Sequence, residues 1–270
     1  MRTVRVLANY YQHFDADLSL EVPTENFGGW KKDWIEISLD HTAVVVMHAW
    51  QFGPPERYPG LYRCIEWIPR AQEICRTVFP RLLAAVRASP LPLFHVVSGN
   101  YYKDLPGYQR AVALAGPEPP PLPRIDKDPV WEQLQRFREH NVCPGSHNIP
   151  DCGEGHRTVT FPPEATPLDH EGVAENGHQL FALCREKGVN HLVYAGFAIN
   201  WCLLFAGGGM ADMSSRGFIC SAFRQATTAV ENKETARRQL NKESELWRVS
   251  VAFGFVFDVD DFIAALQAAS

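Results

Sequence analysis

The sequence lacks several features that would place a protein in a class at once. No apolar run reaches the ~20 residues needed to cross a bilayer. The N-terminus has neither the long apolar core nor the small-residue cleavage site of a secretory signal. There is no excess of positive charge, since 26 Lys and Arg stand against 31 Asp and Glu. We therefore predict a cytoplasmic protein that has no nucleic-acid partner and no membrane partner.

Cysteine is too scarce and too scattered for a disulfide framework. The chain has seven cysteines, an odd number, which favours reduced thiols. Cys143, His147, Cys152 and His156 follow a C-x3-H-x4-C-x3-H pattern. These ligand types suit zinc, but the spacing matches none of the usual zinc pairs, so a polar loop is favoured over a metal site. No metal and no cofactor are predicted.

What the sequence does contain is an alternation of apolar strands and helices. Short apolar runs predict strands at residues 42–48, 93–97, 191–195, 217–222 and 249–253. Helical spacing predicts helices at residues 65–88, 130–140, 179–187, 228–241 and 259–268, with one more directly after Cys202. Alternating strands and helices predict an α/β fold of three layers, α/β/α, around a mostly parallel, Rossmann-like sheet of roughly six strands.

The domain organisation follows from the ends of this pattern. Residues 1–40 are predicted to form an N-terminal β arm, a hairpin of strands at 5–11 and 18–22. Residues 41–270 are predicted to form a single domain. Its regular pattern is interrupted by an insert at about 100–163, where Gly116–Pro123 is too rich in proline for a helix or a strand.

The segment from Gly196 to Cys202 carries the strongest functional signal. It directly follows the predicted strand at 191–195 and precedes a predicted helix. A cysteine at such a turn lies near unpaired backbone N–H groups and the positive end of a helix dipole. We expect this setting to lower the pKa of the Cys202 thiol, which would make it a candidate nucleophile.

Three features together resemble the isochorismatase-like cysteine hydrolases, a superfamily that includes nicotinamidases and N-carbamoylsarcosine amidase. They are the strand at 43–48, the turn Gly-Phe-Ala-Ile-Asn-Trp-Cys at 196–202, and the strand beginning Gly-Phe-Ile at 217. The resemblance covers roughly residues 40–230. It implies that Cys202 attacks a carbonyl carbon and that the N–H groups of Ala198 and Cys202 form an oxyanion hole. It also implies a cis peptide bond between Phe197 and Ala198.

The chain departs from the family at two of three catalytic positions. The family triad is Asp, Lys and Cys, and His48 stands where the Asp is expected. No lysine lies between Lys127 and Lys187, and the nearest basic side chains are Arg157 and His170. An imidazole can activate a thiol because its pKa lies near neutrality, so His48 is a candidate base. The alternative is a hydrogen-bonded histidine in a site whose chemistry has been lost.

Several further side chains are candidates for substrate binding. The carboxyl ends of parallel strands form the ligand crevice of such sheets. The candidates near these ends are Trp50, Asn100, Tyr101 and Trp201, to which His170 is added as a nearby basic side chain. Aromatic residues at strand ends are equally compatible with an ordinary core.

Three functions remain open. The first is a cysteine-dependent hydrolase of the isochorismatase-like type, acting on an amide-like C–N bond or a related bond of a small-molecule substrate. The second is a catalytically inactive homologue that serves as a ligand-binding or assembly module. The third is an isomerase or lyase in which His48 and Cys202 move protons. A homo-oligomer is expected because oligomers are common in families of this kind.

Overall fold

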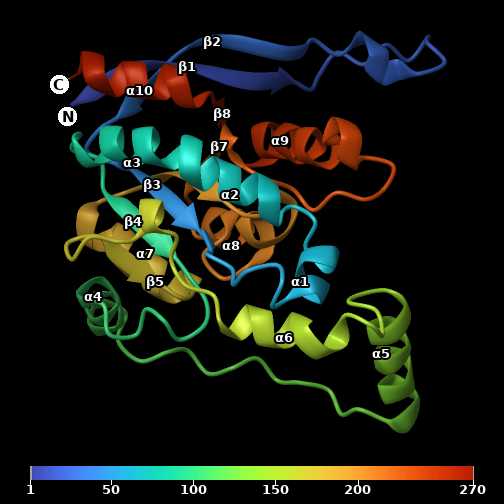
Figure 1. The fold of residues 1–270 in the computed structure, drawn as a ribbon. Coiled ribbons are helices and arrows are strands. Elements are labelled where there is room, and N and C mark those ends of the chain that lie inside the picture. Colours follow the sequence, from blue (N-terminus) through green and yellow to red (C-terminus); the bar gives the residue numbers. More distant parts are fainter. Residues whose placement is uncertain (1, 270) are drawn as a thin grey trace.

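The computed structural model describes residues 2–269 and is built around an eight-stranded sheet (Figure 1). The strands, in the order β2-β1-β8-β7-β6-β3-β4-β5, are β2 (Gly29–Ser38), β1 (Thr3–Gln12), β8 (Val256–Phe257), β7 (Ile219–Thr227), β6 (His191–Gly196), β3 (Thr42–Met47), β4 (Leu93–Val96) and β5 (Gly172–Ala174). The six strands from β8 to β5 are parallel. This confirms the predicted α/β/α class and its mostly parallel sheet.

Helices cover both faces of the sheet. The α-helices of the described residues are α1 (Pro59–Cys64), α2 (Ile68–Thr77), α3 (Phe79–Arg87), α4 (Pro106–Ala115), α5 (Pro129–Asn141), α6 (Ile149–Arg157), α7 (Gly177–Lys187), α8 (Met210–Ser215), α9 (Leu240–Ala252) and α10 (Val259–Ala268), and not all of them lie on the sheet. One core contains α2, α3 and α10 together with Val44 and Val46 of β3. The other contains α4, α7, α8 and α9 with Val45 and Met47. Because both faces of β3 are covered, its sequence is apolar throughout rather than alternating.

The N-terminal hairpin differs from the prediction in its second strand. β1 pairs over ten residues with β2, and residues 18–22 lie in the loop between them. The Ser19 hydroxyl donates a 2.7 Å hydrogen bond to Asp17, and the Leu20 N–H bonds to the Asp17 carbonyl. These turn contacts compete with an extended chain. Leu18 and Val22, the apolar residues that suggested a strand, are exposed. β1 then pairs antiparallel with β8 and so extends the parallel sheet.

Two predicted helices and one predicted strand are also corrected. The helix predicted at 65–88 is broken at Val78 into α2 and α3, because Pro80 has no N–H to continue the first helix. Residues 228–239 are mostly loop, and the last predicted strand (249–253) lies largely in α9. In α9 the buried residues are Leu246 and Val249, three positions apart, which is helical spacing, while Val251 is exposed.

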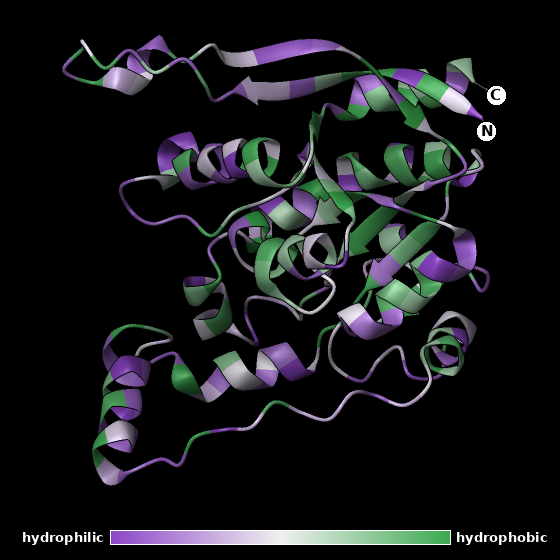
Figure 2. Ribbon diagram, turned by 180° about the vertical axis from the view of Figure 1, so that it is seen from behind, coloured by the Kyte–Doolittle hydropathy of each residue, from purple (hydrophilic) through white to green (hydrophobic). Residues whose placement is uncertain are grey.

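The insert at 100–163 contains three helices, of which only α5 was predicted. α4 and α6 pack against the body of the protein, whereas none of the residues of α5 is buried. The tip of the β1–β2 hairpin and α5 both project from the same side of the molecule (Figures 1 and 2). Apolar residues gather between the sheet and the helices (Figure 2). Among residues 2–269, no helix combines the length and the hydropathy of a membrane span.

Candidate functional site

The candidate site lies where β3 and β6, the two central strands of the six parallel ones, end side by side. Met47 pairs with Gly196, so His48 and Phe197 are the next residues on neighbouring strands. Gly196 has a φ of +126°, and a Cβ placed on it would lie 1.8 Å from the Met47 carbonyl oxygen. Only glycine allows the two backbones to approach this closely.

The chain turns sharply between Gly196 and Cys202. The peptide bond between Phe197 and Ala198 is cis, as predicted. Residues Ile199–Leu203 then form a single π turn, in which the Leu203 N–H donates to the Ala198 carbonyl at 3.2 Å. Such wide turns are frequent at functional sites. Cys202 lies in this turn and is half-buried.

The electrostatics of Cys202 differ from the sequence-based expectation. Burial raises the pKa of the thiol, and a hydrogen bond from the Ala198 backbone lowers it by less. The expected lowering is therefore wrong, because a single π turn offers too few aligned peptides to offset burial. Among residues 2–269, no side chain hydrogen-bonds to the Cys202 sulfur. The thiol form predominates at neutral pH.

His48 is buried directly after β3, with a backbone φ of +50° that is uncommon for a residue other than glycine. Its imidazole stacks on Trp50, with ring centroids 4.6 Å apart and an interplanar angle of 12°. Burial lowers the pKa of His48 to about 4, and Nδ1 has no hydrogen-bond partner among the described residues. The imidazole is thus neutral but only weakly basic at pH 7, and it is not hydrogen-bonded to Cys202.

Two of the predicted binding residues, Trp50 and Tyr101, lie together in an aromatic wall after β3 and β4. The ring centroids of Tyr101 and Phe161 are 4.8 Å apart, and those of Trp50 and His156 are 6.1 Å apart. Burial raises the pKa of the Tyr101 hydroxyl, and the neighbouring Trp50 lowers this pKa by a smaller amount. This wall gives the site an apolar, planar side next to His48.

The other predicted binding residues are dispersed. Trp201 precedes Cys202 in the chain and is 61% exposed, so it lies at the surface of the site. Asn100 is exposed in the loop after β4. His170 lies just before β5, at the amino end of that strand, whereas Cys202 follows the carboxyl end of β6. The structure therefore does not bring His170 to the candidate site.

A charged cluster at the carboxyl ends of β4 and β5 was missed by the sequence analysis. Glu175, which follows β5, accepts hydrogen bonds from the hydroxyls of Tyr102 (2.7 Å) and Tyr108 (2.9 Å) and from the ammonium of Lys103. Burial acts to lower the pKa of Lys103, but its hydrogen bonds to Glu175 and Tyr108 raise the pKa by a larger amount. This lysine therefore stays protonated. Lys103 comes from the loop after β4, outside the 127–187 interval in which a lysine was sought.

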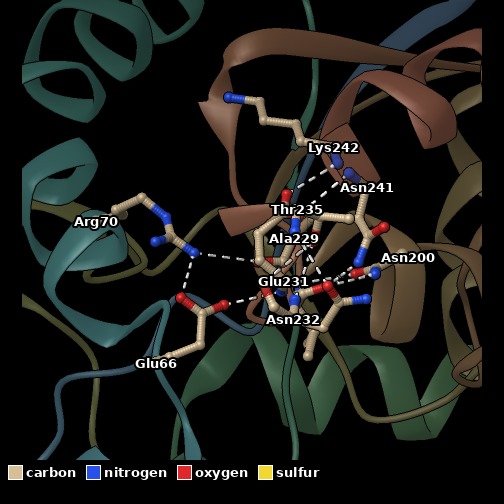
Figure 3. A network of polar contacts seen from close by, with 10 residues as sticks. Glu66, Arg70, Asn200, Ala229, Glu231, Asn232, Thr235, Asn241 and Lys242 are labelled. Carbon is tan, nitrogen blue, oxygen red and sulfur yellow. Dashed lines mark hydrogen bonds and ion pairs between the residues drawn. The ribbon is translucent and has the colours of Figure 1, made fainter. Parts of the chain in front are cut away.

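A polar network fixes the cysteine turn to the loop after β7 (Figure 3). Asn200 donates from Nδ2 to the Val230 carbonyl at 2.9 Å and accepts from the Val230 N–H at 2.8 Å. The Ile199 N–H also donates to the Thr228 carbonyl at 2.7 Å. Three hydrogen bonds therefore hold the first residues of the turn, two positions before the sulfur.

The same loop is held from its other side (Figure 3). The buried carboxylate of Glu231 accepts the N–H groups of Asn241 (3.1 Å) and Lys242 (3.0 Å) at the start of α9. The Glu231 N–H donates to Glu66, which in turn pairs with Arg70 at 2.6 Å. A carboxylate at a helix N-terminus is favourable because that end carries partial positive charge. The network thus links α2, α9 and the cysteine turn.

The four-residue pattern of cysteine and histidine does not assemble into a ligand set. Cys152 lies beside Cys64 of α1, and His156 packs against the aromatic rings of Trp50 and Phe52. Among residues 2–269, no group of three or more His, Cys, Asp or Glu side chains has an arrangement that could hold a metal ion.

Several solved structures are similar in fold to this chain, among them the three that follow. A cysteine hydrolase from Pseudomonas syringae pv. phaseolicola 1448A is 15% identical, with 87% of this chain and 96% of that chain covered and a TM-score of 0.49. An isochorismatase family protein from Burkholderia thailandensis is also 15% identical (84% and 96% covered, TM-score 0.47). N-carbamoylsarcosine amidase from Thermoplasma acidophilum is 16% identical (82% and 97% covered, TM-score 0.43).

No protein-family model matches the sequence, and no curated protein matches it either. At these identities and TM-scores, the likeness to the solved structures carries no information about the chemistry of this chain.

Proposed function

We propose that the protein is a cysteine-dependent hydrolase that cleaves an amide-like C–N bond of a small-molecule substrate. The observation that carries this proposal is the position of the Ala198 N–H. It follows the cis peptide bond, lies against the Cys202 sulfur, and donates to no backbone oxygen of the described residues. A donor placed beside a nucleophile is suited to stabilise the charge that forms on a carbonyl oxygen under attack.

The proposed reaction has two stages. The Cys202 sulfur bonds to the carbonyl carbon, and the carbonyl oxygen takes up the electron pair while facing the N–H groups of Ala198 and Cys202. The electron pair then returns from the oxygen to re-form the carbonyl, the C–N bond breaks, and the nitrogen leaves as an amine carrying the proton that came from the thiol, so that a thioester remains. Water hydrolyses the thioester in the second stage and regenerates the thiol.

His48 is the proposed base and acid of this reaction. Burial leaves its imidazole neutral at pH 7 with an unpartnered Nδ1, but a pKa of about 4 makes it a weak base. The thiol proton therefore moves to His48 only as the sulfur attacks the carbonyl carbon, and it then passes to the leaving amine. In the ligand-free protein His48 and Cys202 are not hydrogen-bonded, so the proposed transfer runs through water or follows a movement of one side chain when substrate binds. The Trp50 ring beneath His48 holds the imidazole in place.

A second candidate function is a ligand-binding or assembly module without catalysis. The observation that favours it is the raised pKa of Cys202 together with the absence of a hydrogen-bonded base among the described residues. Such a module would keep its cellular role when Cys202 is replaced by alanine, whereas an enzyme would lose it.

The test is covalent trapping. The protein is incubated with activated small amides and esters, quenched in acid and weighed intact, and an acyl adduct on Cys202 is expected. Cys202→Ala should abolish the adduct, while Cys143→Ala, which removes an exposed cysteine, should leave it unchanged. An adduct that persists in Cys202→Ala, or no adduct in the unaltered protein, would contradict the hydrolase proposal.

We also propose that the protein forms a homo-oligomer through its two projecting arms. Large apolar side chains are exposed on both, on the hairpin tip and its flanking strand as well as along the 122–142 segment: Phe14, Leu18, Trp34, Leu122, Ile125, Leu134, Phe137 and Val142. Exposed apolar side chains that come together in a contiguous patch mark association sites, and we propose that those of the two arms are covered by a second copy of the chain. Light scattering after gel filtration should give a mass above one chain, reduced by Leu134→Ser together with Phe137→Ser.

A further inference from the structure

A cavity of about 390 Å³ lies at the amino ends of β4 and β5, at the opposite end of the parallel sheet from Cys202. Its floor is formed by the first residues of these strands, Leu93, Phe94 and Gly172. Its walls carry basic side chains from three helices and one loop: Arg87 of α3, Arg110 of α4, His170 of the loop before β5 and Lys187 of α7. The volume falls within the range of small-molecule sites.

The carboxylate in this cavity is already neutralised. Glu171 is buried, accepts from Arg87 Nε at 2.7 Å and lies 2.8 Å from His95 Nε2. Burial acts to raise the pKa of Glu171, but the hydrogen bonds from His95 and Arg87 outweigh it and hold the pKa at about 2. Burial lowers the pKa of His95, so this imidazole is neutral. The ion pair in the cavity is therefore formed by the Glu171 carboxylate and the Arg87 guanidinium. The remaining basic groups of the cavity are not cancelled by this carboxylate.

Arg110 and Lys187 have unused donors. Arg110 Nη2 donates to the His170 carbonyl at 3.1 Å, but its Nε is shielded from water and has no partner among the described residues. Among the described residues, Lys187 pairs with its neighbour Glu186 alone, at 3.7 Å, and its side chain is 45% exposed. A shielded charged donor without an acceptor is costly, so a shift of the Arg110 side chain that brings Nε to a ligand oxygen would be stabilising.

We propose that this cavity binds a small organic oxyanion, with Arg110 and Lys187 as its principal contacts and His170 as a further lining residue. The planar guanidinium edge of Arg110 matches the paired oxygens of a phosphate or a carboxylate. The cavity is larger than an inorganic phosphate, and Pro90 and Pro92 add apolar wall for the body of an organic ligand. Phosphate esters and polycarboxylates share this oxyanion chemistry.

Isothermal titration calorimetry with phenyl phosphate, citrate and inorganic phosphate tests the site. We expect saturable binding of phenyl phosphate or citrate, weakened at least about tenfold by Lys187→Gln and by Arg110→Gln, since each removes a charged hydrogen-bond donor. Lys233→Gln is the matched control, because Lys233 is also exposed and, within residues 2–269, pairs only with the adjacent Glu234, at 3.5 Å. It should leave the affinity unchanged.

The outcomes separate the ligand classes. Binding of phenyl phosphate and not citrate assigns a phosphate ester, the reverse assigns a polycarboxylate, and both support the site. If Arg110→Gln fails to fold, as judged by its thermal melt, Lys187→Gln combined with His170→Gln gives the same test. The proposal is overturned if no probe binds saturably up to about 10 mM, a level that corresponds to very weak affinity. Equal weakening by Lys233→Gln also overturns it, because the attraction would then be nonspecific.

Discussion

The imidazole of His48 lies nearly parallel to the indole of Trp50, with 4.6 Å between the ring centroids. Both residues follow the central strand β3, and His48 is buried. The stack therefore removes from water the one titratable side chain at the end of this strand, and this burial lowers its pKa to about 4. The protonation of His48 and the close approach of β6 to β3 each affect the free energy of unfolding, which can be measured.

The pKa of His48 predicts acid-sensitive stability. An unfolded histidine has a pKa of about 6.5, so between pH 6.5 and 4 the unfolded chain binds a proton that the folded chain does not. The free energy of unfolding should therefore fall as the pH drops through this window, by about 3 kcal/mol from this group, and should not depend on it above pH 7. Urea denaturation at a series of pH values measures this.

The matched variants for this test are His48→Asn and His147→Asn. Asparagine tolerates the left-handed backbone that His48 adopts, and His147 is an exposed histidine. His48→Asn should flatten the dependence of stability on pH, and His147→Asn should not. Some slope remains in both, because burial also lowers the pKa of His191 to about 4. An unaltered slope in His48→Asn would contradict the assignment.

Replacement of Gly196 by alanine should prevent folding or lower the free energy of unfolding by more than about 4 kcal/mol, because the new Cβ would overlap the Met47 backbone. Gly188→Ala is the control. Gly188 also has a positive φ, +67°, but a Cβ added there would lie 3.6 Å from its nearest neighbour, His41 Nδ1. Only the conformational cost of about 1–2 kcal/mol is therefore expected. Chemical denaturation of the two variants separates the overlap from the strain. Similar losses in both would argue against a close approach of β3 and β6.

Asn200→Ala should destabilise the protein by about 1–3 kcal/mol, because it leaves the N–H and the carbonyl of Val230 without this side-chain partner. Asn141→Ala, in the exposed helix α5, should change stability by no more than about 0.5 kcal/mol. Hydrogen exchange should also speed up at residues 199–203 in Asn200→Ala. If protection of that turn is unchanged, Asn200 does not hold it.

The raised pKa of Cys202 predicts its alkylation profile. In the ligand-free protein, the rate of iodoacetamide labelling at Cys202 should still be rising above pH 9, because only the thiolate reacts. N-acetylcysteine under the same conditions is the reference, since a free thiol has a pKa of about 8.5. Peptide mass spectrometry follows the labelling site by site. A profile that levels off below pH 8 would show an activated thiolate and would rule out a raised pKa for this thiol.

The central strands could be predicted from the sequence because burial on both faces leaves a continuous apolar run. β3 and β6 lie within a residue of the ranges predicted. The strand predicted at 249–253 is wrong because a short Val-rich run has no periodicity long enough to separate a helix from a strand. The correct assignment depends on Leu246 and Val249, which both contact the core and are three positions apart, a helical spacing.

The local part of the site could be predicted for a related reason. Ala198 and Cys202 are four residues apart in one turn, so their proximity follows from the chain itself. His170 could not be placed, because it precedes a strand of only three residues, Gly172–Ala174, which has no recognisable pattern. Without that strand, the end of the sheet at which His170 lies is undetermined. Lys103 and Glu175 are 72 residues apart and meet only through tertiary packing.

The pairing of β1 with β8 has a consequence for the solubility of the protein. Without the N-terminal hairpin, the two-residue strand β8 would present its open hydrogen-bonding side to solvent. With it, the outermost strand is β2, which carries Lys31, Lys32, Asp33 and Glu36. Charged residues on a boundary strand discourage intermolecular strand addition. A version shortened by its first 40 residues should therefore self-associate into insoluble material, even though it would retain every residue of the cysteine turn.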